Sequence, residues 1–179
     1  MMEKLADLVE LHVVVDPFFD QNCYVLHRRD SVVGVPLVTA AHGCPAAIHP
    51  DDRWLLEELT PFPGIPADAP PVRCEEDLAG GAVIAWLGLE IAVLHTPGHT
   101  PGSVCFVVGP DLLAGDTLFR RGVGRTDLPG GSHERLLFSI RDRLYPLPPG
   151  TVVHPGHGPA TTIGEEVSGN PFTRGPGPR

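Results

Sequence analysis

Short apolar runs, separated by turns rich in glycine and proline, dominate the hydrophobic pattern of the chain. Runs of β-branched and aliphatic residues bounded by such turns are typical of strands. The pattern predicts eight strands, at Leu11–Val15, Cys23–Leu26, Ala46–His49, Val83–Leu87, Glu90–His95, Val104–Val108, Leu112–Ala114 and Thr151–His154. We expect the first two to form a hairpin, and likewise the pair on either side of Gly88.

Four segments carry helix signals instead. A capping serine and a shared apolar face predict a helix over Ser31–His42, and a proline with two acids in the first turn predicts another from Pro50 to about Leu59. Ser132 is expected to cap a third helix, with Leu137, Ile140 and Leu144 on one face. Thr162 and Glu165 form a capping-box pattern for a short fourth helix.

The order of these elements predicts the fold class. Strands come first and then alternate with helices, which favours an α/β fold of layered helices and sheets over a pure β-sandwich. The length of 179 residues suits one domain. We expect that domain to cover residues 1–170, with a flexible C-terminal tail at 171–179 that is rich in proline and glycine.

Composition narrows the function classes. The formal net charge of −9 argues against a nucleic-acid partner held by basic patches. The four cysteines form no C-x-x-C pair, which predicts reduced thiols in a cytoplasmic protein. No apolar stretch is long enough to span a membrane, and no leader pattern is visible at the start. The 21 glycines and 21 prolines fit an enzyme core with many tight turns.

Histidines gather in two turn segments, HTPGHTPG at 95–102 and HPGHGP at 154–159, each directly after a predicted strand. Asp116 follows a third strand. Three strand ends therefore carry His99, Asp116 and His157, and three protein ligands with one open position are the usual set for a catalytic zinc. Taken singly, a histidine in such a loop is more often a hydrogen-bonding residue than a ligand, and for Asp116 alone a turn cap is favoured still more.

Four longer strings carry a family resemblance: HTPGHTPGS (95–103), AGDTLF (114–119), GVGRTDLPGG (122–131) and HPGHGPATTIGEE (154–166). They resemble metallo-β-lactamase-fold hydrolases of the glyoxalase II-like, or hydroxyacylglutathione hydrolase-like, group. The resemblance implies an αββα sandwich with a metal pair at one edge. It also implies hydrolysis of a small-molecule thioester or related acyl compound by a metal-bound hydroxide.

The same resemblance assigns roles to individual residues. His99 matches a ligand of the first metal, Asp116 the bridging carboxylate and His157 a ligand of the second metal. His95 and His154 match residues that shape the loops and orient the ligands. No residue is assigned to substrate binding, although Arg125 and Asp127 border the expected site; an ion pair within their loop explains them equally well.

One family signature is absent. The string H-x-H-x-D-H, which supplies the remaining ligands in the family, occurs nowhere in the chain. A block of about 30–40 residues, a strand, a helix and a strand, is missing between Arg28 and Val33 by comparison with the family. His42 and His49 offer no replacement, since we interpret them as a helix cap and a surface residue.

Two zinc ions per chain are usual in the family. Here we expect a truncated sandwich that holds at most one metal, either zinc, iron or manganese. Three alternatives remain open: a binding protein that keeps the scaffold without turnover, a chain left incomplete by a deletion, and a persulfide dioxygenase-like iron enzyme.

Overall fold

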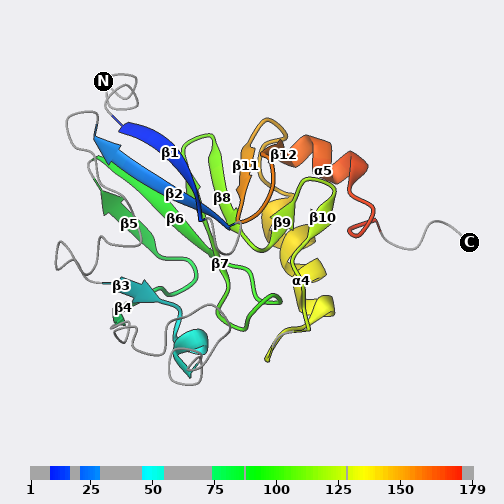
Figure 1. The fold of residues 1–179 in the computed structure, drawn as a ribbon, viewed down its shortest axis with the longest axis horizontal. Helices are drawn as coiled ribbons and strands as arrows, with labels where there is room; N and C mark the ends of the chain where they lie inside the picture. Colours follow the sequence, from blue (N-terminus) through cyan, green and yellow to red (C-terminus); the bar gives the residue numbers. More distant parts are fainter. Residues whose placement is uncertain are drawn as a thin grey trace, which may run out of the picture.

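Figure 1 shows the computed structural model, which describes residues 9–16, 21–28, 46–54, 74–86, 88–127 and 129–174. The strands are β1 Val9–Asp16, β2 Gln21–Arg28, β3 Ala46–Ile48, β4 Cys74–Asp77, β5 Val83–Trp86, β6 Leu89–His95, β7 Val104–Val108, β8 Asp111–Gly115, β9 Leu118–Phe119, β10 Gly122–Val123, β11 Val152–Pro155 and β12 Thr161–Thr162. The helical segments are η1 Pro50–Asp52, α4 His133–Ser139, η2 Ile140–Leu144 and α5 Ile163–Gly169. The helix predicted over Ser31–His42 lies outside the described residues.

The main sheet has six strands in the order β12-β11-β8-β7-β6-β5. Its strands pair antiparallel except for β8 and β11, which are parallel and are linked through α4 and η2. Because β7 runs antiparallel to both β6 and β8, the carboxyl ends of β6, β8 and β11 meet at the same edge of the sheet. The sequence segments that follow these three strands are therefore brought together.

The hydrophobic core lies between this sheet and its helices. Leu136, Ile140 and Leu144 are fully buried and stand four residues apart, so they form one stripe along α4 and η2. They contact buried residues of β7, β8, β11 and α5, which are Cys105, Leu112, Ala114, Val153 and Ile163. Leu137, expected on this face, is only half-buried. The helix register therefore centres on Leu136 instead.

Both predicted helix caps are present, with one difference. Ser132 Oγ accepts from the backbone N–H of Arg135 at 3.4 Å, and Thr162 Oγ1 accepts from Glu165 at 3.2 Å. The Glu165 carboxylate, however, accepts from the hydroxyl of Thr161 at 2.9 Å. Of the two hydrogen bonds expected in the capping box of α5, the one to the Thr162 hydroxyl is present. The Glu165 carboxylate instead bonds Thr161 and so holds the helix to β12.

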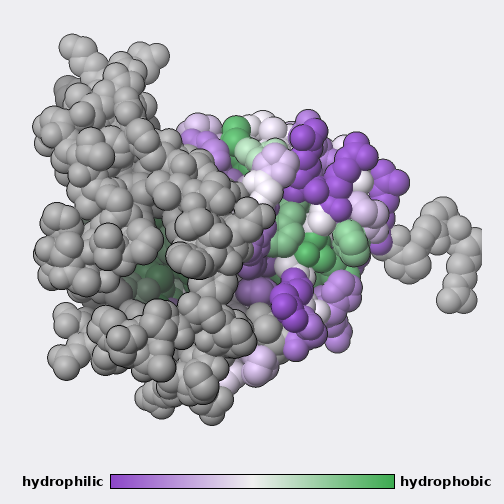
Figure 2. All heavy atoms as spheres, viewed as in Figure 1, coloured by the Kyte–Doolittle hydropathy of each residue, from purple (hydrophilic) through white to green (hydrophobic). Residues whose placement is uncertain are grey.

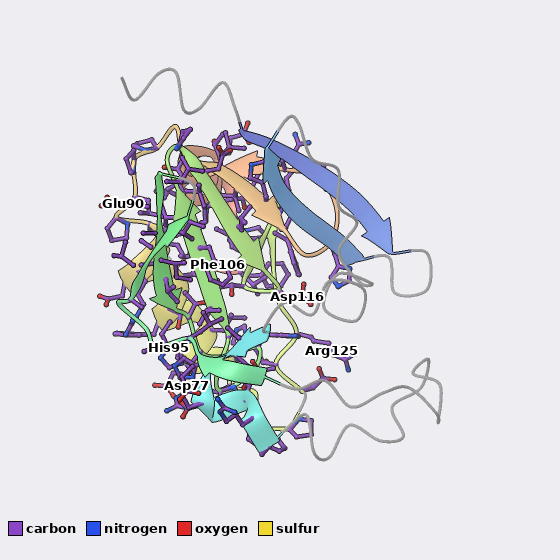
Figure 3. The ribbon with its side chains drawn as sticks, turned by 90° about the vertical axis from the view of Figure 1, so that its left-hand side faces the viewer. Asp77, Glu90, His95, Phe106, Asp116 and Arg125 are labelled. Atoms are coloured by element: carbon purple, nitrogen blue, oxygen red, sulfur yellow. The ribbon has the colours of Figure 1, made fainter. Side chains whose placement is uncertain are left out.

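The opposite face of the main sheet carries the β1–β2 hairpin. The two strands pair antiparallel along their whole length, from Val9 with Arg28 to Asp16 with Gln21. In Figures 1 and 3 the blue hairpin and the yellow α4 lie on opposite sides of the green strands. The described part of the chain therefore has a helix layer, a central sheet and a second β layer, which is a mixed α/β arrangement.

The C-terminal segment is held to the domain beyond residue 170. Asn170 is fully buried, and Thr173 is 6% exposed. The backbone carbonyl of Thr173 accepts from Arg141 Nε at 2.9 Å, and its hydroxyl contacts that of Tyr145. The predicted tail boundary at residue 171 is therefore too early by at least three residues.

The outer surface of the helices is mainly hydrophilic. In Figure 2 the face over α4 and α5 is largely purple, with small separate green patches. Phe138 on α4 and Val167 on α5 are among the exposed large hydrophobic residues. No helix in the described part of the chain is both long and apolar enough to cross a membrane.

Candidate metal centre

The candidate site lies where three strands end. β6 is followed by the turn Thr96–Ser103 that carries His99, β8 by Asp116, and β11 by the turn that carries His157. Gly115 adopts a φ of +49°, a left-handed conformation in which a glycine is unstrained. The chain therefore leaves β8 abruptly and places Asp116 at the edge of the sheet, where Figure 3 labels it.

The structure brings the three predicted ligands together. Nε2 of His99 lies 3.6 Å from Oδ2 of Asp116, and Nε2 of His157 lies 3.4 Å from the same oxygen. The Asp116 side chain is 20% exposed, that of His99 18% and that of His157 39%. Two imidazole nitrogens thus share one carboxylate oxygen in a half-buried site.

A hydrogen bond on the far side of the ring sets the orientation of His99. Its Nδ1 lies 2.9 Å from the backbone carbonyl of Arg125, which can only accept, so Nδ1 carries the proton. In the neutral ring the Nε2 lone pair then faces the Asp116 carboxylate at a distance too long for a hydrogen bond. Two electron-rich atoms facing each other in this way suit a cation between them.

The second carboxylate oxygen points to the same conclusion. Oδ1 of Asp116 is buried and has no hydrogen-bond partner among the described residues. Buried acceptors are nearly always paired, and an unpaired one calls for a missing partner such as an ion. Asp116 therefore has one buried oxygen, Oδ1, that no donor among the described residues pairs.

Two glycines allow this placement of the aspartate. A Cβ on Gly156 would lie 2.1 Å from Oδ1 of Asp116, and a Cβ on Gly124 would lie 1.8 Å from its backbone oxygen. The backbone N–H of Gly156 donates to the carbonyl of Gly115 at 2.7 Å, which joins the β11 turn to the end of β8. Close backbone approach on both sides fixes Asp116 between the two turns.

Two separations within the trio match those between the ligands of one metal ion. A cation held about 2.0–2.2 Å from each ligand atom at tetrahedral angles separates those atoms by roughly 3.4 Å. The two Nε2–Oδ2 separations of 3.4 and 3.6 Å agree with this value. The three ligand atoms do not all lie within 4.8 Å of one another, so the two imidazoles flank the carboxylate and must approach each other to share one ion. The donor set of imidazole nitrogen and carboxylate oxygen suits zinc and iron.

His95 and His154, which we expected to orient the ligands, each bond within the sheet edge. Nε2 of His95 contacts the backbone carbonyl of Pro101 at 2.9 Å, inside the turn that carries His99. Nε2 of His154 contacts Oδ1 of Asp111 at 2.8 Å, linking β11 to the start of β8. His95 therefore acts on the shape of the His99 turn, while the contact of His154 with Asp111 joins β11 to β8.

Arg125 and Asp127 form an ion pair within their own loop. Two nitrogens of the Arg125 guanidinium donate to the two carboxylate oxygens of Asp127, both at 2.7 Å. These hydrogen bonds from Arg125 lower the pKa of Asp127 to about 2. The ion pair is exposed, and it orders the loop whose Arg125 carbonyl accepts the hydrogen bond from His99 Nδ1.

A second group of potential ligand atoms lies at His49, Asp51 and His95, within 4.8 Å of one another. The imidazoles of His49 and His95 are stacked, with centroids 4.0 Å apart and planes 15° from parallel. Lone pairs lie in the ring planes, so in stacked rings they run side by side and do not converge on one ion. Nδ1 of His49 also accepts from the backbone N–H of Asp51 at 3.2 Å, as the N-cap of η1. We interpret this group as structural.

His49 corrects one expectation from the sequence. It was expected at the surface but is 8% exposed, covered by the stacked ring of His95. Burial, followed by the proximity of His95, lowers its pKa. The segment IHPDD therefore contributes to the structure around the His99 turn, a role that its helix-start pattern alone did not reveal. Side chains of His12, His27 and His42 lie outside the described residues.

Comparison with known proteins agrees with the fold and the motifs. Residues 29–157 match the metallo-beta-lactamase superfamily. Similar proteins include the uncharacterized protein ML0493 of Mycobacterium leprae, 44% identical over 77% of this chain and 68% of its own length. Hydroxyacylglutathione hydrolase GloC of Haemophilus influenzae is 39% identical over 68% of this chain and 59% of its own length. The crystal structure of TTHA1623 in a di-iron-bound form superposes with a TM-score of 0.64 at 42% identity, over 77% of this chain and 69% of that one.

The chain belongs to the metallo-beta-lactamase superfamily. By resemblance to this family it is a metallo-hydrolase, and its fold is mixed α/β. Its histidines and carboxylate suit the iron that TTHA1623 binds as well as zinc. The shares of GloC and TTHA1623 that it spans leave roughly a third or more of each relative unmatched.

Proposed function

We propose that His99, Asp116 and His157 hold a divalent metal and that the protein hydrolyses a small-molecule thioester or related acyl compound. The observation that carries the proposal is the approach of two imidazole Nε2 atoms to one carboxylate oxygen, at 3.6 and 3.4 Å, beside a buried and unpaired Oδ1. GloC, a named hydroxyacylglutathione hydrolase, supports the thioester class, and the di-iron form of TTHA1623 supports iron as well as zinc.

When bound, such a cation lowers the pKa of water and polarises a carbonyl. The residues of this chain supply the rest. The Arg125 carbonyl accepts a hydrogen bond from Nδ1–H of His99, which leaves the lone pair of Nε2 available to bind a metal. Gly156 packs against the Asp116 carboxylate and Gly124 against the Asp116 backbone, which keeps the carboxylate next to both imidazoles. The 39% exposure of His157 leaves one side of the site open to solvent and to a substrate.

The number of bound metals follows from the sequence. Without the H-x-H-x-D-H string, the protein lacks the family's remaining ligands, and we propose one metal per chain in a cytoplasmic protein. The same absence favours a second candidate function, in which the chain binds a metal but does not turn over substrate. We propose that a deletion between the segments Cys23–Leu26 and Val33–His42 removed these ligands.

Metal content and hydrolysis measured on the same preparation test the proposal. We expect close to one zinc, iron or manganese per chain by plasma mass spectrometry, and metal-dependent release of thiol from the acetyl thioester of 4-nitrothiophenol. Asp116→Asn and His157→Gln should lose both. His133→Gln, which alters an exposed histidine at the start of α4, is the matched control and should keep both.

The possible results separate the candidate functions. A metal content near one without thiol release favours the binding function. A metal content near two with thiol release would show that other residues complete a pair of sites. Protein that takes up no metal from millimolar solutions would contradict the proposal altogether.

A further inference from the structure

Asp52 reaches from η1 into the turn that carries His99. Its Oδ1 accepts from the backbone N–H of Gly102 at 2.6 Å, and its Oδ2 accepts from the hydroxyl of Thr100 at 2.6 Å. Both partners stand within three residues of His99, although they are 50 and 48 positions from Asp52 in the chain. One carboxylate therefore ties a separate segment directly to the turn.

The turn Thr96–Ser103 is held from two sides. On the helix side, the carbonyl of Gly98 accepts from Ser132 N–H at 2.7 Å and that of Pro97 accepts from Ser139 Oγ at 2.8 Å. A Cβ on Gly98 would also lie 2.4 Å from the backbone of Leu136. These contacts fix the limb of the turn before His99. The limb after His99 is held from within by His95, which contacts the Pro101 carbonyl at 2.9 Å, and it also has support from a separate segment.

Asp52 supplies that support. Thr100 Oγ1 also contacts Ser103 Oγ at 2.8 Å, and Ser103 Oγ accepts from the Thr100 N–H at 3.0 Å. The carboxylate thus closes a small network of hydroxyl groups inside the turn. Hydrogen bonds to an ionised acceptor are shorter and about twice as strong as those between neutral groups. The two 2.6 Å distances fit that class.

The residue at position 102 makes the approach of Asp52 possible. A Cβ on Gly102 would lie 2.6 Å from Cγ of Asp52 and 2.9 Å from its backbone nitrogen. The carboxylate therefore rests against the glycine backbone. Position 102, against which the Asp52 carboxylate packs, is a glycine in the sequence, as this close contact requires.

We propose that Asp52 is a positioning residue that holds the Thr96–Ser103 turn so that His99 Nε2 faces Asp116 before a metal arrives. The inference rests on the proposed function, because it concerns the same metal site. A preformed turn spares the entropy of ordering a loop during binding, so loss of the Asp52 contacts weakens metal binding. Partners beyond the ligands typically contribute 10–100-fold to metal affinity.

The affinity of the metal-free protein for Co²⁺, read from the visible absorption of the bound ion, tests this role. Asp52→Asn should weaken binding about tenfold. Asp51→Asn removes the same charge one position away, from a side chain that is 58% exposed, and should leave the affinity within about twofold. Equal losses in both variants would overturn the proposal.

Thr100 provides a second, independent test. Thr100→Val removes the hydroxyl that donates to Asp52 and should weaken Co²⁺ binding to a similar extent, whereas Thr100→Ser should restore it. The double variant Asp52→Asn, Thr100→Val should be no weaker than about the worse of the two single variants, because both remove one shared contact. Fully additive losses would contradict a shared role.

Hydrogen exchange separates this inference from the proposed function. In the metal-free wild-type protein the Gly102 amide should exchange slowly, and Asp52→Asn should accelerate it. Wild-type protein that binds no Co²⁺ would overturn both the proposed function and a role for Asp52 at a metal. Normal Co²⁺ binding by Asp52→Asn, with or without faster exchange, would overturn the positioning role alone.

Discussion

Gly156 lies so close to Asp116 that any side chain at position 156 would occupy the space of the carboxylate. A Cβ there would fall 2.1 Å from Oδ1 and 3.2 Å from Cγ of Asp116. Gly156, directly after β11, therefore forms one wall of the candidate metal centre, and the Asp116 carboxylate has no room to move toward this residue.

Gly156→Ala tests this wall. The new methyl group must displace the Asp116 carboxylate, so we expect loss of metal binding and destabilisation by about 1–3 kcal/mol, the usual range for overpacking. Gly150→Ala is the matched control, since a Cβ at Gly150 meets nothing within 4 Å. Metal titration and urea unfolding of both variants measure the effect, and similar behaviour of the two would contradict the proposed contact.

Asp116 is expected to lower the stability of the metal-free protein. Its Oδ1 is buried without a partner among the described residues, and its Oδ2 faces two imidazoles. An unsatisfied buried acceptor is unfavourable, so Asp116→Asn should keep or raise the melting temperature in the presence of a chelator. In zinc, the wild type should be stabilised and the variant should not. A clear loss of stability in Asp116→Asn without metal would show that the carboxylate has a structural partner.

The stacked pair of His49 and His95 predicts a pH dependence of folding. Burial and the neighbouring imidazole lower the pKa of His49 in the folded state below its ordinary value of 6.5. As the pH falls through about 6.5 the unfolded chain takes up a proton while folded His49 stays neutral, so the free energy of unfolding decreases. The stability from this residue is complete above pH 6.5 and is lost progressively below it.

His49→Asn isolates this effect. Asparagine is a good N-cap and can still accept from the Asp51 N–H, but it does not titrate in this range. Urea unfolding at pH 7.5 and pH 5.5 should show a smaller drop in stability for the variant than for the wild type. An equal drop would assign the pH dependence to other groups.

Helix α4 offers a pair of substitutions that test the core. Leu136 is fully buried and Phe138, two positions along, is 59% exposed. Leu136→Ala should lower the free energy of unfolding by about 2–5 kcal/mol, whereas Phe138→Ala should change it by about 0.5 kcal/mol or less. Guanidinium unfolding followed by circular dichroism compares them, and a larger effect at Phe138 would mean that the helix is rotated from the described register.

Most strands were predictable because each is a run of apolar residues between turn residues. The prediction failed for β9, β10 and β12, which are two residues long and carry no pattern of their own. It also failed for β4, where Cys74–Asp77 is rich in acids and pairs with β3 through a long-range contact. The position of His49 depends on the ring stacked upon it, which no local pattern records.

Part of the candidate site was predictable for a physical reason. Strand ends were visible in the sequence, and the convergence of His99, Asp116 and His157 follows from the relative directions of β6, β8 and β11. Their role as ligands remains a prediction. Asp52 was visible only as a helix-start acid, because its partners Thr100 and Gly102 lie far along the chain.

The shared direction of β6, β8 and β11 brings His99, Asp116 and His157 to one edge of the sheet. These strands and the α4 helix that packs behind them lie between residues 89 and 155, and the Asp52 contacts to the His99 turn come from an earlier segment. Segments nearer the start of the chain are therefore exchangeable without disturbing this sheet edge as long as the Asp52 contacts are kept. A grafted segment that supplies further imidazole and carboxylate donors next to this edge is then a direct way to build a second metal site.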